Sequence, residues 1–292
     1  MPLWITCTLL AAGLQALRTA AQKQLATTLS PMGATAARYV FGLPVAAAYL
    51  GVLLFTQGDS VPALNGRFAA FAIASGALQI FATAAMITVF SRRNFAVGTA
   101  FAKTEALQSA LFGFVFFGAV LGALDWAAVA IGVAGMLALS ANQIAGGQWR
   151  NPSTLYGIAS GAAFGFTALW LREASLALEG SPLVTAATTL VFMVTVQTAM
   201  CVVWLALREP GQLRALARLH RLGWFVGLTS ALGSAGWFTA MTLENVALVK
   251  TVGQIEILFT LAITRRVFKE AISGVEYLGI ALVVLSVVLV VI

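Results

Sequence analysis

Charged side chains inside apolar segments are the residues of this chain that could do chemistry. Lys103 and Glu105 lie within the stretch 95–117, which is dominated by Phe, Ala, Val, Leu and Gly, and Lys250 lies in a second such stretch. Both lysines are followed by a threonine. Charged groups are costly in lipid, and they usually face the interior of a helix bundle or a water-filled cavity. These residues are therefore the first candidates for a functional site.

Lys103 and Lys250 each allow two interpretations. Either lysine could bind a substrate carboxylate or guard a gate. Alternatively, the long side chain could extend to the membrane surface, as lysines near helix ends commonly do. Lys250 lies about one turn into its segment, so this alternative weighs more for Lys250 than for the deeper Lys103.

The acidic residues Glu105 and Glu256 leave three alternatives open. Each could bind a substrate amine, act as a proton-coupling group, or neutralise a cation on a neighbouring span. Arg18 and Arg38 lie inside apolar segments and are the candidate cations. Charged residues within membrane segments commonly pair with one another, so internal ion pairs are the favoured interpretation.

Polar side chains also recur on single faces of several segments. Residues three and four positions apart share a helix face, so these stripes would converge on a central cavity. The alternative for any one stripe is a hydrogen bond that joins two helices. The candidate cavity residues in these stripes are Gln15 with Arg18, Gln79 with Ser75 and Thr83, Thr99 with Lys103, Ser230 with Ser234, and Lys250 with Gln254.

Four aromatic residues are candidates for the walls of a ligand site. Phe81, Phe101, Trp170 and Trp237 lie away from the expected segment ends, where tryptophan commonly marks the membrane interface. No metal-ligand cluster and no nucleophile triad is visible in the sequence. We therefore expect no enzyme activity, no bound metal and no cofactor.

The composition indicates which elements must position these residues. Of the 292 residues, 60% are hydrophobic and 9% are charged, whereas soluble domains carry about 25% charged residues. A membrane-spanning helix needs roughly 20 apolar residues, and β-barrels would need alternating strands instead. We predict an all-α membrane protein with ten transmembrane helices, at about 3–25, 33–55, 68–90, 95–117, 125–144, 154–172, 183–207, 223–243, 246–265 and 272–292.

Matches at a nearly constant offset predict an internal duplication. They divide the chain into five-helix repeats at 1–147 and 148–292. An odd number of spans per repeat makes the two copies inverted relative to each other, as in many transporters. The expected fold is two inverted five-helix repeats around a central cavity. The matching pairs are Ser30-Pro31 with Ser181-Pro182, Ala85-Met86 with Ala240-Met241, and Lys103-Thr104 with Lys250-Thr251, at offsets of 151, 155 and 147.

The loop charges predict the orientation of the chain. Arg67 and Arg172 lie in loops on the side of Met1, and eleven basic residues lie in loops on the other side. Cytoplasmic loops carry the excess of Lys and Arg, so both termini should lie outside. The net charge of +7 follows from these scattered loops and does not indicate nucleic-acid binding. The eleven residues are Lys23, Arg92, Arg93, Arg150, Arg208, Arg214, Arg218, Arg221, Arg265, Arg266 and Lys269.

The segments that close each half resemble a known family. Trp126–Ala141 and Gly274–Val290 each carry a central glycine, Gly132 and Gly279, and Lys269-Glu270 precedes the second segment. The chain looks like the ten-span EamA-type permeases of the drug/metabolite transporter superfamily. Within that superfamily it is similar to the amino acid and aromatic amino acid exporters of bacteria.

The resemblance implies a secondary transporter that exports small metabolites by alternating access through the central cavity. The expected substrates are amino acids, including aromatic ones. A proton-coupled multidrug exporter, or another metabolite permease of the superfamily, is the alternative. The expected location is a bacterial inner membrane, where the partners are the lipid bilayer and a small-molecule substrate, without nucleic acid and with a monomer as the working state.

Overall fold

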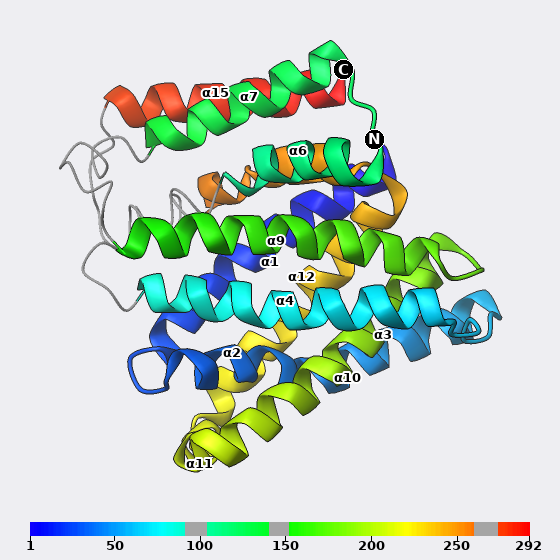
Figure 1. Cartoon of the computed structure of the whole chain (residues 1–292), viewed down its shortest axis with the longest axis vertical. Helices are drawn as coiled ribbons and strands as arrows, with labels where there is room; N and C mark the ends of the chain where they lie inside the picture. Colours follow the sequence, from blue (N-terminus) through cyan, green and yellow to red (C-terminus); the bar gives the residue numbers. More distant parts are fainter. Residues whose placement is uncertain (91–103, 140–151, 260–273) are drawn as a thin grey trace.

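The structure is a computed structural model, and it describes residues 1–90, 104–139, 152–259 and 274–292. Within these ranges the ordered elements are all helices, which confirms the predicted all-α class (Figure 1). The helices are α1 (Leu3–Leu25), α2 (Pro31–Val40), α3 (Gly42–Gln57), α4 (Gly66–Phe90), α6 (Glu105–Phe117), α7 (Ala123–Leu139), α9 (Pro152–Leu176), α10 (Pro182–Arg208), α11 (Pro210–Arg218), α12 (His220–Leu243), α13 (Val246–Gly253) and α15 (Gly274–Val291).

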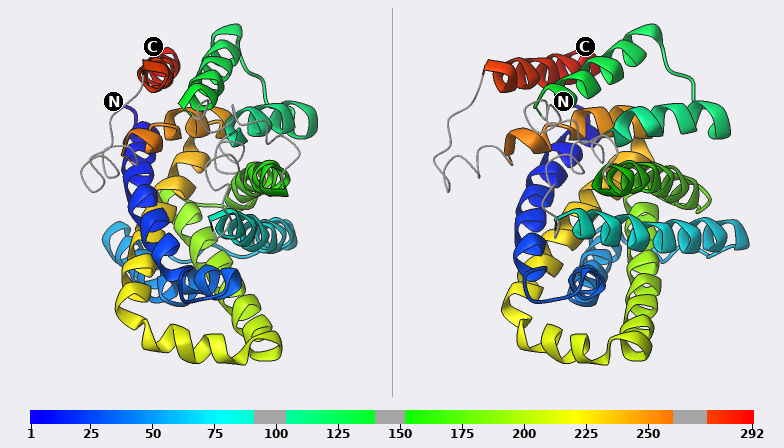
Figure 2. Two further views of the ribbon diagram at one scale, coloured as in Figure 1. Left: turned by 90° about the vertical axis from the view of Figure 1, so that its left-hand side faces the viewer. Right: turned by 60° about the vertical axis from the view of Figure 1, so that its left-hand side comes forward.

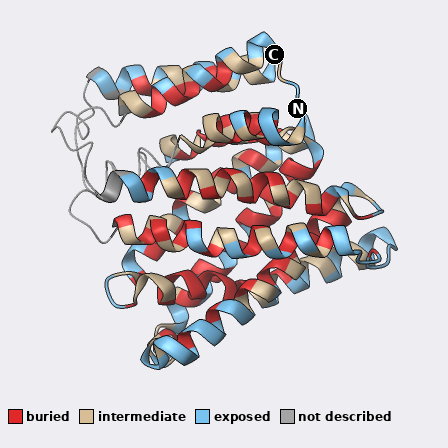
Figure 3. Cartoon of the chain, viewed as in Figure 1, coloured by how far each residue is buried: buried red, intermediate tan, exposed pale blue. Residues whose placement is uncertain are grey.

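The lengths and surfaces of these helices are compatible with a membrane protein. Four described segments are long and apolar enough to cross a membrane: Leu3–Leu25, Pro31–Gln57, Gly66–Val89 and Pro182–Arg208. Buried residues line the faces that the helices turn toward one another, and the outer faces are exposed (Figure 3). These outer faces carry many large apolar side chains, including Phe55, which is 90% exposed. Extended apolar surface of this kind is rare on soluble monomers and marks an interaction with lipid or protein.

Helices from the two halves of the sequence pack against each other. α1 packs along α12, α4 along α9, and α7 along α15, so each pair takes one helix from residues 1–147 and one from 148–292. Figures 1 and 2 show α7 and α15 side by side at one end of the molecule and α11 at the other end. The two ends of the chain lie on the same side of the bundle, to the right in Figure 1.

Glycines allow the backbones of paired helices to approach closely. A Cβ atom at Gly236 of α12 would lie 2.7 Å from the carbonyl oxygen of Cys7 in α1. A Cβ atom at Gly135 of α7 would lie 2.9 Å from the carbonyl oxygen of Gly279 in α15. Association in lipid depends on such contacts, because lipid tails are as apolar as the side chains.

Two helix N-termini are capped in the same way, and each capping serine also contacts the other half of the chain. Ser30 caps α2 by accepting from the amide of Gly33 at 3.1 Å, and its hydroxyl donates to Glu209 at the start of α11. Ser181 caps α10 by accepting from the amide of Val184 at 3.4 Å, and its hydroxyl donates to Gln57 at the end of α3 at 3.0 Å. Both serines precede a proline, which favours the first helical position.

Two predicted spans are interrupted. The span expected at 33–55 divides at Phe41 into α2 and α3, because Pro44 has no amide proton to donate to the carbonyl of Val40. In the span expected at 246–265, α13 ends at Gly253 and a turn follows at 254–255. Broken helices inside a membrane commonly line a binding site.

Candidate functional site

A polar cavity lies among α1, α2, α4, α9, α12 and α13, at the start of α6. The space between its atoms, including a part that is open to the surroundings, is about 640 Å³, and the centre of a water molecule can occupy about 60 Å³ of it. One water occupies about 10–15 Å³ on this measure, so the cavity holds several waters or one small polar group. The predicted residues Gln15, Gln79, Glu105, Trp237 and Lys250 all line it.

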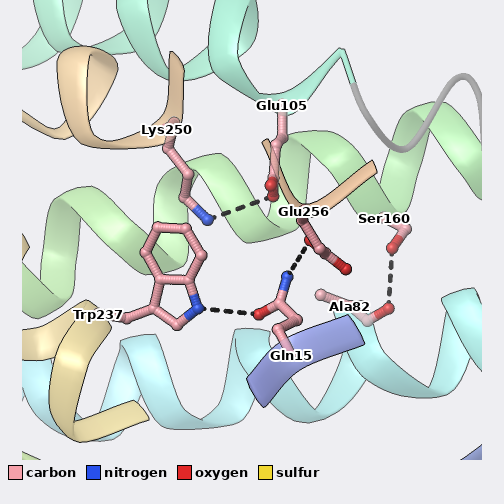
Figure 4. A network of polar contacts seen from close by, with 7 residues as sticks. All are labelled: Gln15, Ala82, Glu105, Ser160, Trp237, Lys250 and Glu256. Carbon is pink, nitrogen blue, oxygen red and sulfur yellow. Dashed lines mark hydrogen bonds and ion pairs between the residues drawn. The ribbon is translucent and has the colours of Figure 1, made fainter. Parts of the chain in front are cut away.

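Lys250 and Glu105 form an ion pair at the edge of this cavity. Lys250 Nζ lies 3.3 Å from Glu105 Oε2, and the two side chains are only 11% and 17% exposed (Figure 4). The same ammonium lies 5.3 Å from the centre of the Trp237 ring, within the range of a cation–π interaction. Lys250 therefore does not extend to the membrane surface. Glu105 pairs with Lys250, which corrects the expectation that Arg18 or Arg38 would neutralise it.

Gln15 connects the two halves of the chain at the cavity. Its amide nitrogen donates to Glu256 Oε2 at 2.7 Å, and its amide oxygen accepts from Trp237 Nε1 at 3.0 Å (Figure 4). The two bonds use one donor and one acceptor of a side chain that can otherwise rotate. The orientation of the Trp237 ring is thereby fixed by α1.

The Trp237 ring also packs onto the C-terminal end of α13. A Cβ atom at Gly253 would overlap with the outer edge of the indole. Glycine is therefore required here by the close approach of a ring, at the residue where α13 ends. Trp237 thus contacts the interruption of the helix on one side and α1 on the other.

Hydroxyl groups fix α4 and α9, which form a further wall of the cavity. Ser75 Oγ donates to the carbonyl of Thr167 at 2.8 Å, and Ser160 Oγ donates to the carbonyl of Ala82 at 2.9 Å. These bonds join two helices, which is the alternative that we considered for the polar stripes. Gln79, on the same stripe as Ser75, lines the cavity and accepts from Gln197 Nε2 at 2.8 Å. The polar stripe of α4 therefore both joins neighbouring helices and lines the cavity.

Arg18 and Arg38 also face the cavity, and they are 7% and 6% exposed. Arg38 donates to Thr83 Oγ1 and to Ser234 Oγ, both at 3.4 Å. Arg18 Nε has no hydrogen-bond partner in the described part of the chain. We expected these arginines to form ion pairs, but among the described residues neither lies within 4.0 Å of a carboxylate.

Several predicted site residues do not line the cavity. Phe81 is 52% exposed on the outer face of α4. It is two residues from Gln79, which is about 200° around a helix, so the sequence itself placed the two on different faces. Trp170 packs against Phe166, with 5.7 Å between ring centres. Gln254 is buried against Gly132, and Thr99, Phe101 and Lys103 lie outside the described residues.

Other cavity residues were missed from the sequence. Phe164, Thr167 and Phe238 line the cavity from α9 and α12. Gln197 lines a second hollow beside it, which also includes Arg38. A glutamine in the middle of the apolar helix α10 is a signal that could have identified Gln197, because polar groups in lipid need partners. The phenylalanines carry no such signal.

The described residues contain no group of three or more His, Cys, Asp or Glu side chains that could hold a metal ion. The side chains that line the cavity offer charges, hydrogen-bonding groups and aromatic rings.

Comparison with solved structures shows that the chain shares its fold with known proteins. A protein of known crystal structure is similar to the chain with a TM-score of 0.70 and 17% sequence identity, over 98% of this chain and 94% of that one. It is one of 27 matching chains of solved structures. No family model matches the sequence, and no curated protein matches it. Identity this low shows a shared fold and carries no information about function.

Proposed function

We propose that the protein is a secondary transporter that exports small metabolites across a bacterial inner membrane. The observation that carries the proposal is the polar cavity, because contacts between the two halves of the chain surround it. Lys250 to Glu105, Gln15 to Glu256 and Trp237 to Gln15 all cross from residues 148–292 to residues 1–147. Alternating access requires contacts of this kind, which can open and close as two halves rock around a central site.

The reciprocal caps at Ser30 and Ser181 support the proposed inverted repeats. Two structurally equivalent halves would make such contacts in pairs, because each contact of the first half has a counterpart in the second. The glycine-mediated pairing of helices and the interruption after Gly253 agree with the same architecture. In this proposal ten spans cross the membrane, and both termini lie outside.

Amino acids, including aromatic ones, are the proposed substrates. The cavity offers cations for a carboxylate and the rings of Trp237, Phe164 and Phe238 for an aromatic side chain. An apolar cavity of about 150 Å³ holds a benzene molecule, whereas this cavity offers about 60 Å³. The conformation is therefore a contracted one, and the helices would need to separate to admit an aromatic substrate.

A proton-coupled exporter is the second candidate. The carboxylates Glu105 and Glu256 lie at or near the cavity, where a change of protonation would break their contacts with Lys250 and Gln15. Glu105→Gln and Glu256→Gln would then remove the dependence of transport on the proton gradient. A transport rate that is unaffected by pH in the parent protein would exclude this candidate.

Flux measurements in proteoliposomes test the proposal. Uptake of labelled phenylalanine, leucine, glutamate, lysine, glucose and a cationic dye should be compared in one preparation. We expect phenylalanine to exchange fastest, with liposomes lacking protein as the control. Absence of flux for every amino acid, with flux of the dye, would replace the first candidate by a drug exporter.

Lys103 remains a proposed substrate anchor. Lys103→Ala should strongly reduce transport and leave the yield of folded protein unchanged. Arg67→Ala is the matched control, because Arg67 is a surface cation whose side chain is 68% exposed and pairs with Glu173. Transport by the Lys103→Ala protein at the parent rate would remove Lys103 from the site.

A further inference from the structure

Two buried arginines share the cavity, and among the described residues neither lies within 4.0 Å of a carboxylate. Arg18 comes from α1 and Arg38 from α2, and both are more than nine-tenths buried. Buried charges are normally paired, because the cost of removing them from water is large. An arrangement in which two cations contact no anion in the described part of the chain therefore needs an explanation.

The surrounding charges do not balance these arginines. Arg18 and Arg38 line the same cavity, so their like charges repel each other. Within the part of the chain that the structure describes, Arg38 forms hydrogen bonds only to two neutral hydroxyls, both at 3.4 Å. These bonds are at the long limit for hydrogen bonds, so they orient the guanidinium and compensate little of its charge.

The acidic side chains near the cavity are already engaged. Glu105 binds Lys250. Glu256 accepts from Gln15, which is itself held by Trp237, and it has further interactions. Of the cations described at the cavity, the two guanidiniums are therefore those without a carboxylate within 4.0 Å.

We propose that Arg18 and Arg38 form an anion subsite, which binds the carboxylate or another oxyanion of the transported molecule. This inference rests on the proposed transport function and specifies the class of substrate. A guanidinium presents parallel N–H donors that match the oxygens of a carboxylate or phosphate. The space available, about 60 Å³, accepts such a group in the present conformation.

The subsite predicts which molecules are rejected. An organic cation would meet two positive charges, and the carboxylates described near the cavity, Glu105 and Glu256, are already engaged, so it should bind poorly. A zwitterion or an anion gains the arginines as partners and relieves their repulsion. The inference therefore favours anionic and zwitterionic substrates over the cationic compounds typical of multidrug exporters.

Binding of four phenyl compounds to the purified full-length protein tests the inference. The series is 3-phenylpropionate, phenyl phosphate, phenylalanine and 2-phenylethylamine, which share the ring and differ in charge. We expect the first three to bind by calorimetry and to raise the Tm, and 2-phenylethylamine to do neither. Tighter binding of 3-phenylpropionate would show that the preferred oxyanion is a carboxylate, and tighter binding of phenyl phosphate that it is a phosphate.

Substitution of each arginine is the second part of the binding test. Arg18→Gln and Arg38→Gln should each weaken binding of 3-phenylpropionate roughly 10- to 100-fold, as expected for loss of a charge-assisted hydrogen bond. Arg18→Lys and Arg38→Lys should retain part of the affinity, because the charge remains and the paired donors are lost. Arg67→Gln, at an exposed ion pair outside the cavity, should leave it unchanged.

The stability of the ligand-free variants separates a binding role from a structural one. Removal of one of two repelling charges should leave the Tm of the ligand-free protein unchanged or raise it. A lower Tm for both glutamine variants, or an unchanged affinity for 3-phenylpropionate, would overturn the inference. So would 2-phenylethylamine binding as tightly as 3-phenylpropionate, or the absence of binding by any oxyanion.

The flux assay distinguishes failure of this inference from failure of the proposed function. Binding of 3-phenylpropionate that depends on Arg18 and Arg38, without flux of any compound, retains the subsite and removes the transport proposal. Flux of phenylalanine that is unaffected by Arg18→Gln and Arg38→Gln retains transport and removes the subsite.

Discussion

The ammonium nitrogen of Lys250 lies 3.3 Å from Oε2 of Glu105, although 145 residues separate the two in the sequence. The contact joins the last turn of α13 to the first turn of α6. A cation in the last turn of a helix and an anion in the first turn are each favoured by the helix dipole. The pair thus connects the two halves of the chain at a place where both charges suit their helices.

Disruption of this pair should cost more than disruption of a surface pair. We expect Lys250→Met or Glu105→Gln alone to reduce the free energy of unfolding by about 1–3 kcal/mol, between the values for exposed and fully buried pairs. The double variant should recover most of this loss, because no single charge is left behind. Denaturant titration of the four proteins measures the coupling.

The exposed pair Arg67–Glu173 is the control for that cycle. Its disruption should cost under about 1 kcal/mol. Additive effects of Lys250→Met and Glu105→Gln would show that the two side chains do not interact in the folded protein.

The contact between Gly253 and Trp237 predicts an overpacking effect. Gly253→Ala should destabilise the protein by about 1–3 kcal/mol, because a methyl group there overlaps with the indole. Trp237→Phe should partly restore stability in the Gly253→Ala background, since its ring is smaller. Gly51→Ala is the control, because no atom lies within 4 Å of a Cβ at Gly51. An equal loss from Gly51→Ala would indicate an effect of helix flexibility.

The two serine caps should make similar contributions. Ser30→Ala and Ser181→Ala should each cost about 0.5–2 kcal/mol, the usual value of a lost N-cap. Thr56→Ala should cost less, because the exposed Thr56 hydroxyl bonds only to carbonyls of its own helix. Thermal unfolding of the three variants in one detergent makes the comparison, and a Thr56→Ala effect as large as the others would contradict it.

The orientation can be tested with single cysteines. In a Cys7→Ser/Cys201→Ala background, Pro2→Cys should react with an impermeant thiol reagent in intact cells. Arg218→Cys, on the exposed face of α11, should react only after lysis. The reason is the excess of basic residues in and beside α11, which the positive-inside rule assigns to the cytoplasm. The reverse pattern would invert the proposed topology.

Much of the candidate site could be predicted from sequence. Gln15, Gln79 and Lys250 were identified because polar groups within apolar segments need partners. Trp237 was identified as an aromatic residue away from the expected segment ends, and all four line the cavity. The partners themselves could not be predicted. The sequence offered several possible cationic partners for Glu105. Only the packing of α6 against α13 places Lys250 beside it.

The sequence by itself determined the all-helical class and the polar residues that must avoid lipid. These properties follow locally, because in lipid each segment must satisfy its own backbone hydrogen bonds. Only the tertiary structure decided which apolar side chains face inward. Phe81 turned outward while Phe164 and Phe238 line the cavity, and composition cannot separate them, because the interior of a bundle and the surrounding lipid are equally apolar. The same packing brought Arg18 and Arg38 to one cavity, since the rotation of α1 and α2 depends on the helices they contact.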